Sequence, residues 1–210
     1  ELRPMTIRLR HTRTLVLAAL MAVGECAAAT FASAQIVFTS RDSSAISKVV
    51  ASARVELTRP PNKLIRARQD ALADSLVAVS LTPSSAGIGR DVLTAAVSTL
   101  SFSGSTGVKY PYSGAAERLL VVAQSARDEH LKSAATFGLG HLSDTAAATS
   151  ALRTLAISAS AQARWAVRYL GTSYGESGLQ VLRALRRDGS VRDRTARRFL
   201  DQFAATYGWP

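Results

Sequence analysis

Three similar stretches in the second half of the sequence decide how the chain is expected to fold. They read LKSAATFGLG over residues 131–140, QARWAVRYLG over 162–171 and RDRTARRFLD over 192–201. Each has an alanine near its centre and a leucine four positions later. The stretches recur about every 30 residues, and a period of this size is typical of proteins built from stacked repeats. This half of the chain is therefore interpreted as a helical repeat array.

A second amphipathic segment follows each of the first two stretches. Leu152 and Leu155 in the first segment correspond to Leu182 and Leu185 in the second, which is one repeat further along the chain. The repeating unit is thus a helix, a glycine turn, a second helix and a short loop. Because one helix pair cannot bury its apolar face alone, neighbouring units are expected to stack and share a core.

The helix ends in this half carry their own signals. Gly140 and Gly171 follow a leucine at the end of the first helices, so we expect each to adopt the left-handed conformation that terminates a helix. Ser190 and Asp193 suggest a variant capping box at the start of the last helix. That helix, which extends to Tyr207, is expected to cap the array.

Helical periodicity without an obvious repeat extends through residues 35–114. Apolar residues recur at helical spacing over 44–57 and again after Asn62, which can cap the second helix. A third helix is expected to begin at Asp91. A long loop is predicted over 101–114, where glycine, serine and proline are frequent. The expected fold class is all-α, a short α-solenoid of antiparallel helix pairs.

The repeat pattern resembles the HEAT-like repeats that are named after phycobilisome lyases. The resemblance covers residues 115–207. It implies that residues 115–210 form a domain of HEAT-like repeats that ends in a C-terminal capping helix. It is carried by Asp128-Glu129-His130-Leu131-Lys132 with Leu139-Gly140, by Ala163-Arg164 with Leu170-Gly171, and by Ser190-Val191-Arg192 with Phe199-Leu200. Asp201 stands where the pattern has glycine. The resemblance implies the solenoid architecture, whereas no residue supports the bilin attachment that the lyase name implies.

Residues 1–34 have the three-part organisation of a secretory signal peptide. Basic residues within 8–13 precede an apolar run over 15–23, and Ala32-Ser33-Ala34 supplies a small-residue cleavage site. A membrane span needs about 20 apolar residues, so a run of about nine is too short to cross a bilayer. We therefore expect residues 1–34 to be removed by cleavage after Ala34.

Several alternatives to this leader remain open. Met5 is the expected start, with residues 1–4 upstream of it. Cleavage could instead follow Ala29, the leader could be retained as an anchor, or the segment could form a buried alanine-rich helix. Lipidation of Cys26 is disfavoured because Glu25 stands where a small residue is needed.

Composition and charge narrow the class of protein. The chain is 47% hydrophobic and only 6% aromatic, which excludes a disordered or collagen-like chain. Without residues 1–34 it has no cysteine, so it could form neither a disulfide nor a thiolate metal site. The net charge is +11 for the whole chain and +9 for residues 35–210, with 22 basic and 13 acidic residues. Such a charge favours an acidic partner.

Arginine is concentrated near the C-terminus and supplies most of the candidate binding residues. Guanidinium groups make bidentate contacts to phosphates and carboxylates, which is typical of docking surfaces for acidic partners. The candidates are Arg183, Arg186, Arg187, Arg194, Arg197 and Arg198. The alternative is that they form only the solvated face of an end cap.

Trp165 and Tyr169 are the other candidate binding residues. Four residues apart on one expected helix, they could line a concave peptide-binding face, or they could simply pack on the neighbouring repeat. The loop over 101–114 is the second place where a long segment could carry function.

No motif indicates catalysis. The sequence predicts no nucleophile elbow, which is a sharp turn from a strand into a helix, and it contains no H-E-x-x-H motif of a zinc protease. Gly87-Ile88-Gly89 lacks the third glycine of a dinucleotide-binding motif. His130 and His141 lie at opposite ends of one expected helix, about 16 Å apart by helical rise, too far to share a metal. We therefore expect no enzymatic activity, no cofactor and no metal site.

These observations lead to one expected function and one alternative. The first is an exported HEAT-like repeat protein, periplasmic or secreted, that acts as a protein–protein interaction scaffold in the bacterial cell envelope, with partners the sequence does not identify. The alternative is a module that binds an anionic surface, such as lipid head groups, lipopolysaccharide or another polyanion, through the C-terminal arginines. Nucleic acid is not expected as a partner, because an exported chain would rarely meet it, and no transmembrane segment is expected in the mature chain.

Overall fold

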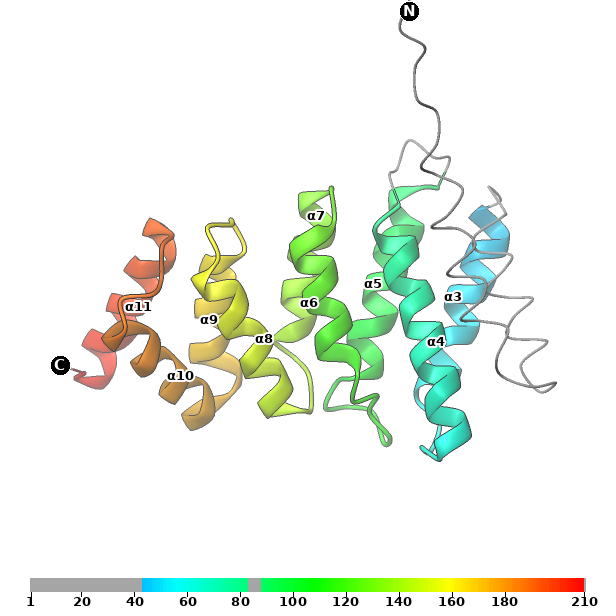
Figure 1. Cartoon of the computed structure of the whole chain (residues 1–210), viewed down its shortest axis with the longest axis horizontal. Coiled ribbons are helices and arrows are strands. Elements are labelled where there is room, and N and C mark those ends of the chain that lie inside the picture. Colours follow the sequence, from blue (N-terminus) through cyan, green and yellow to red (C-terminus); the bar gives the residue numbers. More distant parts are fainter. Residues whose placement is uncertain (1–42, 83–87, 210) are drawn as a thin grey trace, which may run out of the picture.

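A computed structural model describes residues 43–82 and 88–209 of the chain, and every regular element in these ranges is a helix (Figure 1). One isolated bridge pairs Ser105 with Leu142. The all-α prediction is confirmed. The predicted leader over residues 1–34 lies outside the described residues, together with its cleavage site.

The helices follow one another at short intervals along the chain. In order they are α3 (Ser43–Leu57), α4 (Lys63–Ser80), α5 (Arg90–Ser103), α6 (Ala115–Ser125), α7 (Glu129–Leu139), α8 (Thr145–Ile157), α9 (Ala163–Ser173), α10 (Gly175–Arg187) and α11 (Arg194–Tyr207).

These helices pack as two layers along a single row, with α3 and α11 at its two ends (Figure 1). Each odd-numbered helix contacts the next odd-numbered one, from α3 to α11, and the even-numbered helices do the same from α4 to α10. Each helix also contacts its neighbours in sequence. Each helix therefore packs mainly against helices that are one or two places away in the chain order. The hydrophobic core is continuous along the row.

The alanines of the three repeated stretches occupy the same place in successive helices of the odd layer. Ala135 on α7, Ala166 on α9 and Ala196 on α11 are each 0% exposed, and the leucine four positions after each is also buried. A small side chain at the centre of each helix allows the neighbouring helices to approach closely. The interval between the repeated stretches thus corresponds to one step along the odd layer.

The prediction that Gly140 and Gly171 adopt the left-handed conformation is wrong. Gly140 has a φ of −72° in the right-handed region, and Gly171 lies inside α9. Both positions instead lie against an aromatic ring of the next odd-numbered helix. A Cβ at Gly140 would lie 2.8 Å from the ring of Tyr169, and one at Gly171 would overlap the ring of Phe203. These glycines make room for a neighbouring side chain and do not reverse the chain.

The predicted caps are partly confirmed. Asn62 caps α4, because its side-chain oxygen accepts a hydrogen bond from the amide of Ile65 at 2.9 Å. At the last helix, Asp193 is the N-cap and accepts from the amide of Ala196 at 2.7 Å. The proposed capping box, which began at Ser190, is therefore wrong, since the cap lies three positions later.

The loop predicted over 101–114 is shorter than expected. Helix α5 continues through Ser103, so Phe102 is helical, and the connection to α6 covers 104–114. Tyr112 anchors this connection, with only 2% of its surface exposed and its hydroxyl donating to Asp70 of α4 at 2.6 Å. Burial, together with this hydrogen bond, raises the pKa of Tyr112 above its usual range. Tyr112 therefore links the connection before α6 to helix α4.

Candidate functional site

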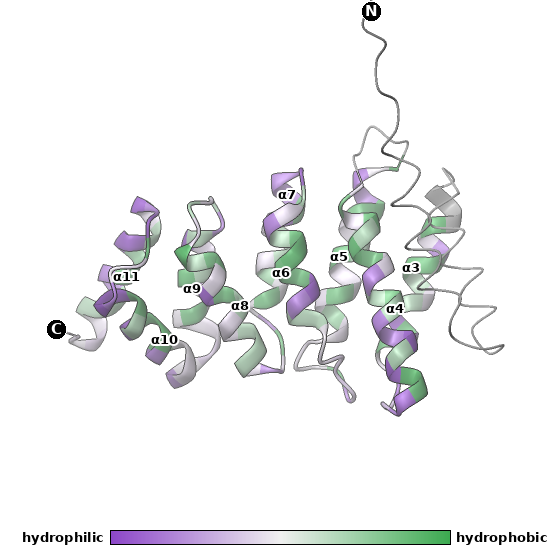
Figure 2. Ribbon diagram, in the orientation of Figure 1, coloured by the Kyte–Doolittle hydropathy of each residue, from purple (hydrophilic) through white to green (hydrophobic). Residues whose placement is uncertain are grey.

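The six predicted arginines lie on the last two helices, which belong to different layers. Figure 2 shows the N-terminal turns of α11 as strongly hydrophilic. Helix α10, in the even layer, carries Arg183, Arg186 and Arg187, and α11, in the odd layer, carries Arg194, Arg197 and Arg198. A group that is compact in sequence is thus divided between two layers of the fold.

Two of the α10 arginines are engaged within the molecule. Arg183 forms an ion pair with Glu176 at 2.9 Å, and its guanidinium lies 5.2 Å from the centre of the Trp209 ring. Arg187 pairs with the adjacent Asp188 at 3.3 Å. Both pairs are solvent-exposed, so each contributes little to stability, but each offsets part of the positive charge on α10.

The two predicted aromatic residues on α9 have different surroundings. Tyr169 is half-buried and packs toward α7, with its ring centre 6.1 Å from that of Phe137 and 6.2 Å from that of His141. Burial raises the pKa of its phenol. Trp165 has guanidinium groups near its ring from the same helix. Tyr169 therefore joins two helices, as one of the two sequence interpretations expected, whereas Trp165 remains partly accessible.

Two arginines that the sequence interpretation left out extend the basic surface of the odd layer. Arg164 and Arg168 are exposed on α9, one repeat before Arg194 and Arg198 on α11. We call these four residues the α9–α11 arginine face. The repeat interval that aligns the buried alanines of α9 and α11 could have identified this face from sequence.

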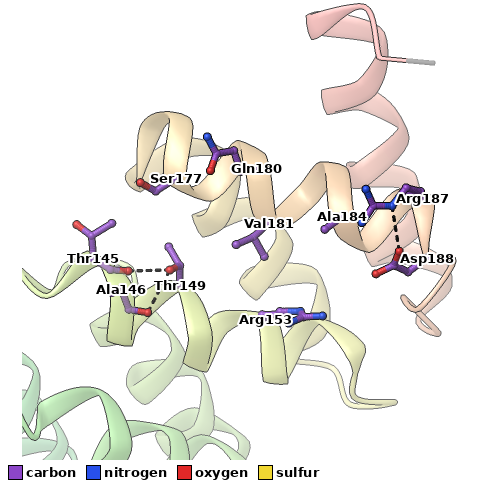
Figure 3. A pocket seen from close by; sticks show the side chains of 10 residues that line it. All are labelled: Thr145, Ala146, Thr149, Arg153, Ser177, Gln180, Val181, Ala184, Arg187 and Asp188. Carbon is purple, nitrogen blue, oxygen red and sulfur yellow. Dashed lines mark hydrogen bonds and ion pairs between the residues drawn. The ribbon is translucent and has the colours of Figure 1, made fainter.

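A groove separates α8 from α10 on the even layer, with a volume of about 580 Å³ (Figure 3). We call it the α8–α10 groove. It is lined from α8 by Thr145, Ala146, Thr149 and Arg153, and from α10 and its C-terminal end by Ser177, Gln180, Val181, Ala184, Arg187 and Asp188. Most of these side chains are small, which is why the two helices leave space between them.

The chemistry of the α8–α10 groove changes along its length. Small and hydroxyl-bearing side chains line the part near the start of both helices, whereas Arg153 and Arg187 lie toward their ends (Figure 3). The Thr149 hydroxyl donates back to the carbonyl of Thr145 at 2.8 Å, so its hydrogen-bonding capacity is partly used within α8. Arg153 is exposed and forms no ion pair with a described carboxylate. The groove thus offers an uncharged part and a charged end, where Asp188 pairs with Arg187 and Arg153 stays unpaired among the described residues.

The remaining candidates do not form a site of their own. The centre of the His141 ring lies 4.4 Å from the centre of the Phe137 ring, so this histidine takes part in an aromatic contact. Within residues 43–82 and 88–209, no three histidine, cysteine or acidic residues gather as metal ligands would. None of the helices described is both long and apolar enough to cross a membrane.

Of the residues predicted from sequence, only Arg187 lines the α8–α10 groove. The groove depends on which helices become neighbours, and no repeated motif indicates its small residues. Comparison of the chain with models of known protein families, with curated proteins and with solved structures finds no match.

Proposed function

We propose that this chain is a HEAT-like α-solenoid scaffold that holds a protein partner in the cell envelope, with a segment of that partner seated in the α8–α10 groove. The observation that carries the proposal is the groove itself, open to solvent between two neighbouring helices of one layer. Stacked helical arrays commonly present extended surfaces of this kind to their partners.

The lining of the groove indicates the chemistry of the partner segment. Ala146, Val181 and Ala184 provide apolar contact, and Gln180 and Ser177 can exchange hydrogen bonds with a peptide backbone. At the other end Asp188 already pairs with Arg187, so Arg153 is the guanidinium left to bind a carboxylate through two parallel hydrogen bonds. The partner segment is therefore a short peptide with small apolar side chains and an acidic residue at one end.

The envelope location rests on the sequence of residues 1–34, with its basic, apolar and small-residue regions in the order of a signal peptide. The lack of cysteine after residue 34 is compatible with an oxidising compartment, where free thiols would react.

Site-specific photo-crosslinking in envelope extracts tests the proposal. A photoreactive amino acid at Gln180, inside the groove, should give a discrete adduct with a protein of defined mass. The same amino acid at Gln124, exposed on α6 of the same layer, should give none. Equal adducts at both positions, or no adduct at Gln180, would contradict the proposal.

Two substitutions sharpen the test. Ala184→Trp should fill the groove and abolish the adduct, and Arg153→Glu should weaken it because the partner carboxylate would meet a like charge. Arg127→Glu is the matched control, since Arg127 is exposed between α6 and α7, away from the groove. An adduct that survives Ala184→Trp in a folded protein would exclude the groove as the binding site.

A further inference from the structure

The α9–α11 arginine face gathers four guanidinium groups on one side of the odd layer. Arg164 and Arg168 are four positions apart on α9, as Arg194 and Arg198 are on α11, and residues at this spacing are neighbours on a helix surface. Helices α9 and α11 contact each other and run in the same direction (Figure 1). The four side chains therefore form two parallel pairs on adjacent helices.

The charge of this face is not compensated within the described part of the molecule. All four arginines are exposed, and none forms an ion pair with a carboxylate of the described residues. Asp201 on α11 is exposed nearby and is likewise unpaired there, so it offsets only a part of the positive charge. By contrast, Arg118 on the even layer meets Asp74 at 3.0 Å.

Aromatic side chains accompany these charges. The half-buried ring of Trp165 has the guanidinium of Arg164 5.3 Å from its centre and that of Arg168 5.7 Å away. On the adjacent α7, Phe137 is 55% exposed although it is large and apolar. Its ring packs edge-on against Tyr169 of α9, so the aromatic residues and the arginines belong to neighbouring helices of one layer.

We propose that the α9–α11 arginine face docks on an anionic lipid bilayer, with its guanidinium groups on lipid phosphates and Trp165 and Phe137 at the level of the head groups. Tryptophan is enriched at this depth of a bilayer, and basic residues near an anionic leaflet are attracted to it. The charged face carries a partly exposed indole, which suits a bilayer, whereas the α8–α10 groove on the other layer suits a peptide segment.

This inference goes beyond the scaffold function. The α8–α10 groove belongs to the even layer and the arginine face to the odd layer, so a partner could occupy the groove while the opposite layer contacts the membrane. The protein would then hold its partner at a membrane surface.

Vesicle co-sedimentation of the full chain tests the proposal, with vesicles of phosphatidylglycerol and phosphatidylcholine. Arg168→Glu with Arg198→Glu should reduce binding at least tenfold, because removing a cation near an anionic surface costs about fivefold. The matched control is Lys63→Glu with Arg127→Glu, which changes the net charge equally at exposed positions outside both the arginine face and the α8–α10 groove. It should reduce binding by less than about threefold. All variants share the same N-terminal segment, so a difference in vesicle binding between them reports the contribution of the α9–α11 arginine face.

A second readout follows Trp165 directly. In a Trp209→Phe background, the fluorescence of Trp165 should shift to shorter wavelength on adding the anionic vesicles, and raising the salt from 0.1 to 0.5 M should reverse much of the binding. Equal losses in the two double variants, or no loss in either, would overturn the proposal. Binding to soluble polyglutamate as strong as to the vesicles, with no shift of Trp165, would overturn it in favour of an acidic protein.

Discussion

Gly171 on α9 lies so close to Phe203 on α11 that a Cβ at position 171 would overlap the phenyl ring. The two residues belong to consecutive repeated helices of the odd layer. Helix α9 continues through this position to Ser173. The contact with Phe203 explains why a glycine stands inside the helix.

Gly171→Ala should therefore destabilise the protein. Alanine normally stabilises a helix interior by about 1 kcal/mol relative to glycine, whereas overpacking a tight contact costs about 1–3 kcal/mol. We expect a net loss of about 1 kcal/mol in the free energy of unfolding, measured with urea. Gly107→Ala is the control, because nothing lies within 4 Å of a Cβ there, and it should change stability by less than about 0.5 kcal/mol. A more stable Gly171→Ala protein would contradict this role.

Gln69→Leu should be strongly destabilising although the volumes are similar. Gln69 is 2% exposed, and its amide nitrogen donates to the carbonyls of Glu56 at 3.1 Å and of Leu57 and Arg59 at 3.3 Å. Leucine would leave these carbonyls, at the end of α3, without that donor, at a cost of about 2 kcal/mol. Thermal and urea unfolding measure the change.

The comparison for this prediction is Gln124→Leu, at an exposed position of α6. It should alter the free energy of unfolding by less than about 0.5 kcal/mol. Similar values for the two leucine variants would show that the buried amide of Gln69 is not needed.

Asp193→Ala should destabilise α11 because it removes the N-cap. The Asp193 carboxylate accepts from the amide of Ala196, and loss of such a cap costs about 1 kcal/mol. Ser190→Ala should have a smaller effect, since the Ser190 hydroxyl reaches only the carbonyl of Leu185 at 3.5 Å. The two variants are compared by urea unfolding. A larger loss for Ser190→Ala would restore the capping box that the sequence suggested.

Tyr174 should make the stability of the protein sensitive to alkaline pH. Its hydroxyl donates to the carbonyl of Leu139 and accepts from the amide of Leu142 at 3.1 Å. Burial raises the pKa of Tyr174 to about 12, above its usual value near 10. Because the folded state favours the neutral phenol, the stabilisation is complete below about pH 10 and is lost as the pH rises through 12.

Tyr174→Phe should therefore lose about 1 kcal/mol at pH 7, where the hydrogen bonds are removed. Between pH 10 and 12 its stability should fall less steeply than that of the unchanged protein. Tyr207→Phe is the control at pH 7, because Tyr207 is 48% exposed, and it should change the free energy of unfolding by less than about 0.5 kcal/mol. Parallel profiles for Tyr174→Phe and the unchanged protein would contradict the assignment.

The sequence predicted some local features correctly because they depend on few neighbouring residues. The cap at Asn62 needs only an amide three positions later, and that amide is present at Ile65. The glycine prediction failed for the opposite reason. A glycine after a leucine suits both a left-handed helix end and a close approach between helices, and only the position of Tyr169 or Phe203 distinguishes them.

The candidate site could be predicted less completely than the helices. A run of arginines near the C-terminus is visible in sequence, but its division between α10 and α11 depends on which layer each helix joins. Arg164 and Arg168 lie outside that run, and only the repeat spacing relates them to Arg194 and Arg198. The α8–α10 groove has no sequence signal, because its walls come from helices that are not consecutive.

By itself, the sequence determined that the described residues form helices, and it indicated a spacing of about 30 residues in the second half, since helical periodicity and recurring alanines are properties of local spacing. Only the tertiary structure decided which helices lie side by side. It placed glycines under aromatic rings, opened a groove between α8 and α10, and brought the arginines of α9 and α11 onto one face. These features depend on contacts between helices, which residues distant in sequence make together.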